Sequence, residues 1–177
     1  MNRRTVIKSI LFVSAGASLI PACMNDKGKA SFLLKNITVG GDEEKMLADL
    51  CETIIPATTG VPGAKELSSH LFALTMIDEC MPKEGQQKFM KGLTAFETLV
   101  KQRYSKDFTL CTAEQKTALL TDIEQKKNIP AEVNDFYGIV KRFTIQSFTT
   151  SQYFLTKVQV YELVPGRYHG CVPVKTA

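Results

Sequence analysis

Apolar residues recur at intervals of three and four positions through most of this 177-residue chain, and prolines stand where the pattern is interrupted. This spacing places apolar side chains on one face of an α-helix. Proline ends or breaks a helix because it has no amide hydrogen to donate. The first such stretch begins at Asp42, has Leu47, Leu50 and Ile54 among its apolar positions, and stops at Pro56. The pattern therefore predicts a chain built from helices of ordinary length.

Four more stretches have the same character. Helices are predicted to begin near Ala64 and end before Pro82, to run from about Phe89 to Tyr104, to open at Thr112, and to restart at Pro130. Thr112 and Gln115 stand at the spacing of a capping box, in which each side chain bonds a free backbone amide at a helix start. The stretch after Pro130 has the longest apolar stripe, from Val133 to Phe148, so we expect it to be the central helix.

The C-terminal region has a different pattern. Beyond Ser151 the helical spacing fades, and residues 165–173 contain prolines and glycines that do not fit a continuous helix. The sequence has no internal repeat of the kind that builds solenoids. The prediction is an all-α fold, with a bundle of about five helices and an irregular C-terminal arm.

Residues 1–22 are typical of an export signal. Arg3, Arg4 and Lys8 precede an uncharged run at residues 10–20, which is about half the length that a transmembrane helix needs. Arg3-Arg4, two apolar positions and then Lys8 match the twin-arginine (Tat) signal, which addresses folded proteins for export. An ordinary signal for unfolded export that happens to contain two arginines is the alternative.

The end of this signal resembles a lipoprotein cleavage site. The run Leu-Ile-Pro-Ala at residues 19–22 precedes Cys23, which would become the lipidated first residue. Pro21 is atypical there, and a plain cleaved signal with Cys23 as a bystander is the alternative. Residues 23–41 are expected to form a flexible tether, and residues 42–177 a single domain. We therefore expect a periplasmic protein, anchored to a membrane by lipid.

Composition argues against several classes of function. The formal net charge of +4 falls to +1 once Arg3, Arg4 and Lys8 leave with the signal, and the remaining charges of both signs are interspersed. No basic field remains to attract nucleic acid. The sequence has no glycine-rich phosphate loop after a strand, no Cys-x-x-Cys and no Cys-x-x-Cys-His. We therefore predict no dinucleotide, metal or covalent haem site on this chain.

Cysteines are the first group of candidate functional residues. If Cys23 is lipidated, four remain: Cys51, Cys80, Cys111 and Cys171. In an exported chain they are candidates for disulfides, and sequence cannot choose among the three pairings of four cysteines. A free buried thiol is the alternative for each, most clearly for Cys51, which lies on the apolar face of its predicted helix.

Histidines and carboxylates are the second group. His70 flanks the apolar stripe of its predicted helix, which favours a hydrogen-bonded core or interface histidine, with a catalytic base as the alternative. His169 stands in a glycine-flanked loop, where it could reach a partner or face water. Asp78 and Glu79 are expected on a solvated face rather than as a carboxylate pair. No residue is predicted to be catalytic.

Short motifs between about Leu47 and Pro173 are specific in combination. They are Leu50–Ala57, which includes Ile55 and Pro56; Pro62, Gly63 and Ala64 ahead of His70; Phe89–Gly92; Asp107 and Phe108 ahead of Gln115; Phe136 and Tyr137; and the tail of Val164, Pro165, Gly166, Arg167, Tyr168, His169, Gly170 and Cys171. Together they resemble the gluconate 2-dehydrogenase subunit 3 family. The resemblance makes these residues the candidate partner interface: Ile55, Pro56, Pro62, Gly63, Ala64, His70, Pro165, Gly166, Arg167, Tyr168, Gly170 and Cys171.

The resemblance implies a non-catalytic small subunit of an exported flavin-dependent sugar, sugar-acid or alcohol dehydrogenase. FAD and the catalytic base would belong to a large subunit of the glucose-methanol-choline type, often accompanied by a cytochrome c with haem c. Such small subunits often carry the only twin-arginine signal of the pair, which fits Arg3 and Arg4. This chain would then assist folded co-export, stability and membrane attachment, with Cys23 as a departure from members that rely on a cytochrome partner.

Two other functions stay open at the level of sequence. The chain could be an enzyme that uses His70 and a nearby acid in a pocket between helices. It could also be a stand-alone periplasmic lipoprotein that binds a small ligand or scaffolds the envelope. A neighbouring gene for a flavin-dependent oxidoreductase without its own signal would argue against the lipoprotein.

Overall fold

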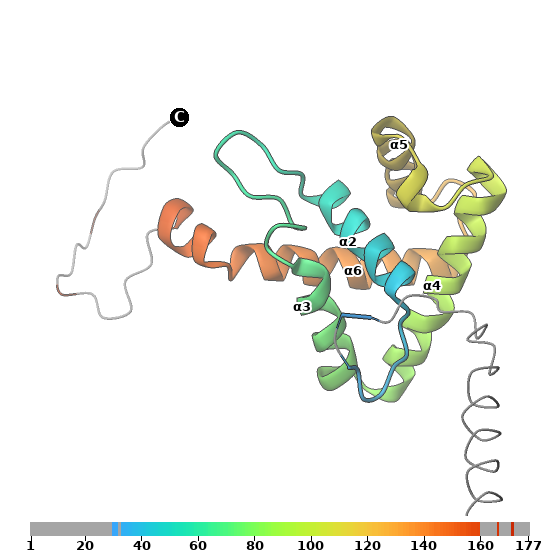
Figure 1. Ribbon diagram of the computed structural model, residues 1–177, viewed down its shortest axis with the longest axis horizontal. Helices are drawn as coiled ribbons and strands as arrows, with labels where there is room; N and C mark the ends of the chain where they lie inside the picture. Colours follow the sequence, from blue (N-terminus) through green and yellow to red (C-terminus); the bar gives the residue numbers. More distant parts are fainter. Residues whose placement is uncertain (1–29, 32, 160–165, 167–170, 172–177) are drawn as a thin grey trace, which may run out of the picture.

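A computed structural model describes residues 30–31, 33–159, 166 and 171, and in this part of the chain the fold is all-α with no strand, as predicted. The helical elements are α2 (Gly41–Ile54), α3 (Ser69–Thr75), η1 (Met76–Cys80), α4 (Lys83–Tyr104), η2 (Phe108–Leu110), α5 (Ala113–Glu124), α6 (Ala131–Thr149) and η3 (Phe154–Val158) (Figure 1). Of these, η1 and η3 are π-helical turns and η2 is a 3-10 turn. None of the described helices is long and apolar enough to cross a membrane.

Local sequence explains where most helices begin. Three acids occupy the first turn of α2, where the exposed amides and the helix dipole favour negative charge. The side chain of Glu43 accepts a bond of 2.6 Å from the backbone N–H of Gly40. The predicted capping box at α5 is confirmed, because Gln115 N–H donates to Thr112 Oγ1 at 3.3 Å and Thr112 N–H donates to Gln115 Oε1 at 3.0 Å.

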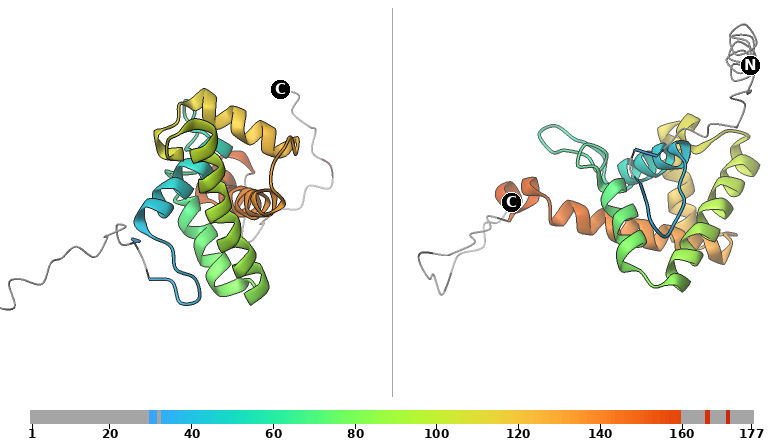
Figure 2. Two further views of the ribbon diagram at one scale, coloured as in Figure 1. Left: turned by 90° about the vertical axis from the view of Figure 1, so that its right-hand side faces the viewer. Right: turned by 60° about the horizontal axis from the view of Figure 1, so that its bottom comes forward.

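The predicted central helix, α6, packs against α2, α3, α4 and α5. Figure 2 (left) looks nearly along α6 and shows α4 running across it. Where they meet, the ring centroids of Phe89 and Phe136 are 5.3 Å apart, and those of Phe96 and Phe136 are 5.4 Å apart. All three rings are fully buried. Gly92 permits the close approach, since a β-carbon there would collide with Cβ of Phe136 and lie 2.5 Å from the carbonyl oxygen of Glu132.

The second helix differs from its prediction. It was expected near Ala64, yet α3 begins only at Ser69, and residues 64–68 form turns. Ser68 has a positive φ of 53°, which breaks a right-handed helix. After α3 the chain continues directly into η1, which ends at Cys80, two residues before the proline that was expected to close the helix.

The prediction of a flexible tether at residues 23–41 is wrong for residues 35–39. Ile37 and Val39 are each only 6% exposed and belong to the core. The carboxylate of Asp78 accepts the backbone N–H groups of Lys35, Asn36 and Ile37 at 2.8, 2.7 and 2.9 Å. The chain is therefore fastened to the domain before α2 starts, because burial of two apolar side chains and three bonds to one carboxylate outweigh its weak helical pattern.

The C-terminal end is helical for longer than expected. The pattern was predicted to fade beyond Ser151, but η3 continues to Val158. Six residues of the predicted tail motif lie outside the described part of the chain: Val164, Pro165, Arg167, Tyr168, His169 and Gly170. Gly166 and Cys171 are described and exposed. The signal residues Arg3, Arg4, Lys8 and Cys23 are also outside the described residues.

Candidate functional site

The predicted motif residues from Ile55 to Ala64 form the loop between α2 and α3. Its tip is a tight turn in which Thr58 and Val61 exchange two backbone hydrogen bonds of 3.0 Å. Gly60 in this turn has a φ of 79°, a conformation that glycine adopts without strain. Ala64 N–H donates to the carbonyl of Ile55 at 2.9 Å, which closes the base of the loop. In Figure 1 the tip stands away from the helices.

Glu52 holds this loop from α2. Its two carboxylate oxygens accept the backbone N–H groups of Ala57 and Lys65, each at 2.9 Å. A β-carbon at Gly63 would collide with both of these oxygens and lie 2.7 Å from the backbone nitrogen of Ala57. Glu52 and Gly63 therefore fix the shape of the loop together. Sequence reasoning singled out Gly63, whereas Glu52 was quoted within the Leu50–Ala57 motif without a role of its own.

Asp49, one turn before Glu52, ties three elements together. Its carboxylate pairs with Lys65 Nζ at 2.8 Å and with Lys116 Nζ of α5 at 3.1 Å. Burial raises the pKa of Asp49, but the two ammonium groups outweigh burial and hold this pKa below its usual range. Lys116 also lies 5.1 Å from the ring centroid of Phe108, so it joins α5 to η2 as well.

His70 lies at the start of α3, close to Glu44 of α2. Its Nε2 is 3.9 Å from Glu44 Oε1, and each side chain is only 12% exposed. Glu44 also accepts Ser31 N–H at 2.6 Å and the Ser31 hydroxyl at 2.5 Å. Burial lowers the pKa of His70; Glu44 opposes this shift and Lys65 adds to it. The imidazole is therefore neutral at pH 7.

One side of His70 faces a closed void. His70 Nδ1 and Ser69 Oγ are buried and have no hydrogen-bond partner among the described residues. The small void beside His70 is lined by apolar side chains and Cys51, and it has no room for a water molecule. A general base must come within hydrogen-bond distance of the proton that it removes. This void gives a substrate no such access.

Asp78 corrects another prediction. It was expected on a solvated face, but it is 3% exposed and accepts the three backbone bonds described above. Gln86 Nε2 adds a bond of 2.8 Å to the Asp78 carbonyl. Glu79 does face solvent, where it pairs with Lys35 at 2.9 Å. No local pattern could mark Asp78, because its carboxylate partners are more than 40 positions away in the sequence.

The model of one protein family, gluconate 2-dehydrogenase subunit 3, matches residues 41–166. The chain belongs to the gluconate 2-dehydrogenase subunit 3 family. This confirms the resemblance seen in the sequence, and members of this family are subunits of a dehydrogenase. The chain has no significant match among the curated proteins or the solved structures.

The matched region of this gluconate 2-dehydrogenase subunit 3 member contains the α2–α3 loop and all helices from α2 to η3. It therefore includes the residues that shape the loop, from Glu52 to Ala64, and the Glu44–His70 pair. It ends at Gly166, so Arg167 to Cys171 of the predicted tail motif fall outside it. The close fit between Glu52 and Gly63 gives these loop residues a role in the fold itself, because it sets the shape of the loop.

The four candidate disulfide cysteines of this family member are all free thiols in the structure. Cys51 and Cys111 are buried, while Cys80 and Cys171 are exposed. The Thr144 hydroxyl lies 3.2 Å from Cys51 Sγ, and burial raises the pKa of Cys51 to about 11. Cys51 is therefore a protonated core thiol at neutral pH. Burial also raises the pKa of Cys111.

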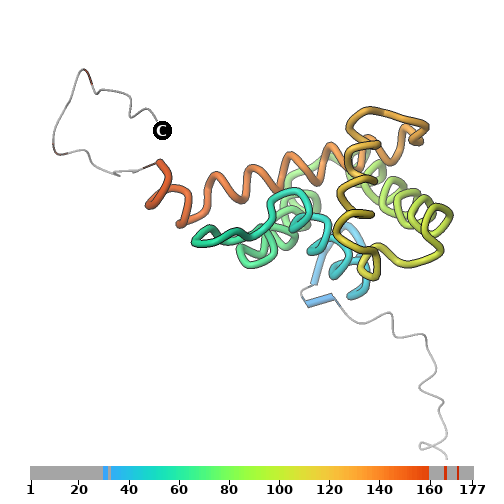
Figure 3. The backbone as a smooth tube through the Cα atoms, turned by 90° about the horizontal axis from the view of Figure 1, so that it is seen from above, coloured from blue at the N-terminus to red at the C-terminus, as the bar shows by residue number. Residues whose placement is uncertain are grey.

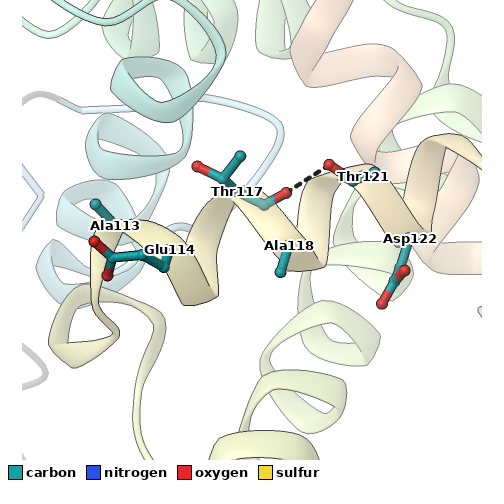
Figure 4. Close-up of a pocket in the computed structure, with 6 residues that line it drawn as sticks. All are labelled: Ala113, Glu114, Thr117, Ala118, Thr121 and Asp122. Atoms are coloured by element: carbon teal, nitrogen blue, oxygen red, sulfur yellow. Dashed lines mark hydrogen bonds between the residues drawn. The ribbon is translucent and has the colours of Figure 1, made fainter.

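A broad hollow lies along the exposed side of α5 (Figure 4). It is lined by Ala113, Glu114, Thr117, Ala118, Thr121 and Asp122. The Thr121 hydroxyl donates to the Thr117 carbonyl at 2.9 Å, so it is engaged within its own helix. In the described part of the chain, no three His, Cys, Asp or Glu side chains are grouped to hold a metal ion.

Proposed function

We propose that this chain is the non-catalytic small subunit of an exported flavin-dependent sugar, sugar-acid or alcohol dehydrogenase. It assists folded co-export, stability and membrane attachment of a catalytic subunit of the glucose-methanol-choline type. FAD and the reacting groups belong to that partner, and a cytochrome c with haem c is a further partner. The observation that carries this proposal is the family match over residues 41–166.

Two features of the domain support an accessory role. His70, which forms the candidate acid–base pair with Glu44, lines a void that has no room for a water molecule. The family motif at Pro62 to Ala64 is explained by loop shape rather than by reacting groups, because Gly63 sits against the carboxylate of Glu52. Both features fit a subunit that contributes a shaped surface.

The export part of the proposal rests on the N-terminal sequence. Arg3 and Arg4 stand ahead of an uncharged run that ends near Cys23. A folded-export signal suits a complex in which a cofactor must be inserted before transport. Lipidation of Cys23 would then hold the complex at the membrane, and the domain is fastened to its N-terminal segment at Ser31 and Lys35 to Ile37.

Co-purification of the tagged full-length chain from membranes of its native host tests this function. We expect a flavoprotein in equimolar amount, identified by its flavin absorbance and by dye reduction with a sugar, sugar acid or alcohol. A monomeric chain without a flavoprotein would contradict the proposal and favour the stand-alone lipoprotein.

Two variants separate export from anchoring. Replacing Arg3 and Arg4 together with lysine should leave both proteins in the cytoplasm, whereas Cys23→Ala should release the exported complex from the membrane. Export of the flavoprotein at the normal level with the lysine pair would show that this chain does not direct it.

A further inference from the structure

The outer face of α6, defined by Gly138, Arg142 and Ile145, is not covered by any described part of the chain. These positions follow one another at helical spacing, and all three are exposed. In Figures 1 and 3 the end of α6 extends beyond the other helices and continues into η3. The outer face thus runs along an element that projects from the bundle.

No contact within the described part of the chain requires a glycine at position 138. A β-carbon built there would meet nothing within 4 Å, and its φ is not positive. Glycine inside a helix is less stable than alanine, because it loses more conformational freedom on folding. At Gly92 the same loss is explained by contact with α6. At Gly138 the unfilled space lies on the outside, and no described residue occupies it.

Apolar side chains accumulate at the projecting end. Ile145 is 43% exposed and Val158 is 55% exposed. Between them, Phe148 packs on Tyr153 and Phe154, with ring centroids 6.4 and 5.8 Å apart. These half-exposed rings do not belong to the main core. Aromatic side chains outside the core are typical of protein interfaces.

The charges of this region have one sign. Residues 136–159 contain Lys141, Arg142 and Lys157 but no Asp or Glu. Lys141 is paired with Glu124 at 2.5 Å. Within the described residues, neither Arg142 nor Lys157 forms an ion pair. An acidic partner therefore complements this surface. A second copy, joined through the same face, would place like charges opposite each other.

The α2–α3 loop supplies an uncharged neighbour. Residues 53–64 contain no charged side chain, and the loop tip lies toward the same end of the molecule as η3 in Figures 1 and 3. Glu52 holds the loop in one shape. A fixed shape favours a protein partner, since a membrane surface requires none. Two free cations are also fewer than the roughly four to eight of lipid-binding basic segments.

We propose that the outer face of α6 and the aromatic cluster at its end dock the catalytic subunit of the dehydrogenase, through an apolar patch bordered by carboxylates. This inference rests on the proposed function and adds the location and chemistry of the contact. Gly138 lets the partner approach the helix backbone, Ile145 and the aromatic rings bury apolar area, and Arg142 and Lys157 pair with acids at the border.

Gly138→Ala provides a test with opposite signs in two measurements. The isolated variant should unfold at a higher temperature than the native chain, because alanine favours the helix. The same variant should retain less flavoprotein in the co-purification, because the methyl group occupies the partner's space. If Gly138 had only a structural role, the unfolding temperature and the flavoprotein retention would rise or fall together. Unchanged flavoprotein retention would contradict the proposal.

Ile145→Asp and Arg142→Glu test the rest of the surface. Each should weaken flavoprotein binding at least tenfold in a titration of the purified full-length chain, while circular dichroism stays native. The matched control is Leu110→Asp, because Leu110 is 67% exposed and its element, η2, lies away from this end of α6 in Figure 1. This variant should bind normally. If native-like Ile145→Asp and Arg142→Glu bind as the unmodified chain does, the docking surface is wrong and the proposed function stands. If the unmodified chain binds no flavoprotein, both proposals fail.

The other occupants have their own readouts. Vesicles of phosphatidylcholine with phosphatidylglycerol report lipid binding, and sedimentation velocity reports self-association. If Ile145→Asp abolished either of these but left flavoprotein binding unchanged, the face would belong to the membrane or to a second copy, and the proposal would be overturned.

Discussion

The carboxylate of Glu52 occupies the space that a β-carbon of residue 63 would need. Glu52 is in α2 and Gly63 is in the loop that returns to α3, so glycine at position 63 allows the loop to close tightly on α2. The two hydrogen bonds from Ala57 and Lys65 keep the carboxylate in this position.

Gly63→Ala should destabilise the domain by about 1–3 kcal/mol, the usual cost of forcing an extra carbon into a packed site. The Glu52 side chain can move, but the backbone nitrogen of Ala57, 2.7 Å from the new carbon, cannot move without opening the loop. Urea unfolding at pH 7 measures the loss. Gly166→Ala is the control, because a β-carbon there has open space. Equal stability of the two variants would contradict this packing.

Gly92→Ala should also destabilise the chain, by about 1–3 kcal/mol, because α4 would be pushed away from Phe136 and Glu132. Gly138→Ala makes the same chemical change on the exposed side of α6 and should stabilise by about 0.5–1 kcal/mol. Thermal unfolding of both variants gives the comparison. A stabilised Gly92→Ala would show that the two helices are not in close contact at this point.

Asp78→Asn should loosen the segment before α2 and cost about 2–3 kcal/mol, since an amide has one acceptor oxygen for three backbone donors. Trypsin should then cleave after Lys35 in the variant and leave the native chain intact there. Glu79→Gln removes only an exposed ion pair with Lys35 and should change stability by less than about 1 kcal/mol. Equal protection of Lys35 in all three proteins would contradict the role of Asp78.

Asp78 should also contribute to acid unfolding. Burial raises its pKa, but three backbone N–H donors outweigh burial and hold the pKa below the ordinary 3.8. The unfolded chain therefore binds the proton more readily, so the contribution is complete above the unfolded pKa and is lost as the pH falls through the lower folded value. Urea midpoints between pH 6 and pH 2.5 should fall more steeply for the native chain than for Asp78→Asn.

His70 should make stability fall below neutral pH. Burial is the main reason that its pKa in the folded chain is lower than 6.5, so protonation favours the unfolded state. Its contribution is complete above pH 6.5 and is lost as the pH falls through the folded value. Proton NMR should show one imidazole titrating below 6.5, and His70→Gln should remove that signal and flatten the stability profile between pH 7 and pH 5. A pKa above 6.5 would contradict this interpretation.

Sequence periodicity predicted helices that depend on local signals. The end of α2 before Pro56, the capping box of α5 and the central position of α6 all follow from residues close in the chain. The late start of α3 was not predictable, because Ser68 takes a left-handed conformation without being glycine. The same holds for the segment around Ile37, whose burial depends on a carboxylate 41 positions away.

Sequence likewise predicted only some residues of the candidate site. Gly63 and His70 could be named from the motifs. The structural roles of Glu52, which lies within the Leu50–Ala57 motif, and of Glu44 could not be predicted, because each depends on a distant segment that folds back onto the acid. The sequence left each of the four cysteines open to a disulfide or a free thiol, and in the structure all four are free.

The sequence by itself determined that this protein is helical and, through its combined motifs, to which family it belongs, because helix formation and short motifs depend on neighbouring residues. Only the tertiary structure decided that Asp78 fastens the N-terminal segment, that Glu52 shapes the α2–α3 loop, and that Gly138 faces open space. Each of these features depends on which residues, distant in the sequence, become neighbours in space. Packing brings them together only when the whole chain has folded.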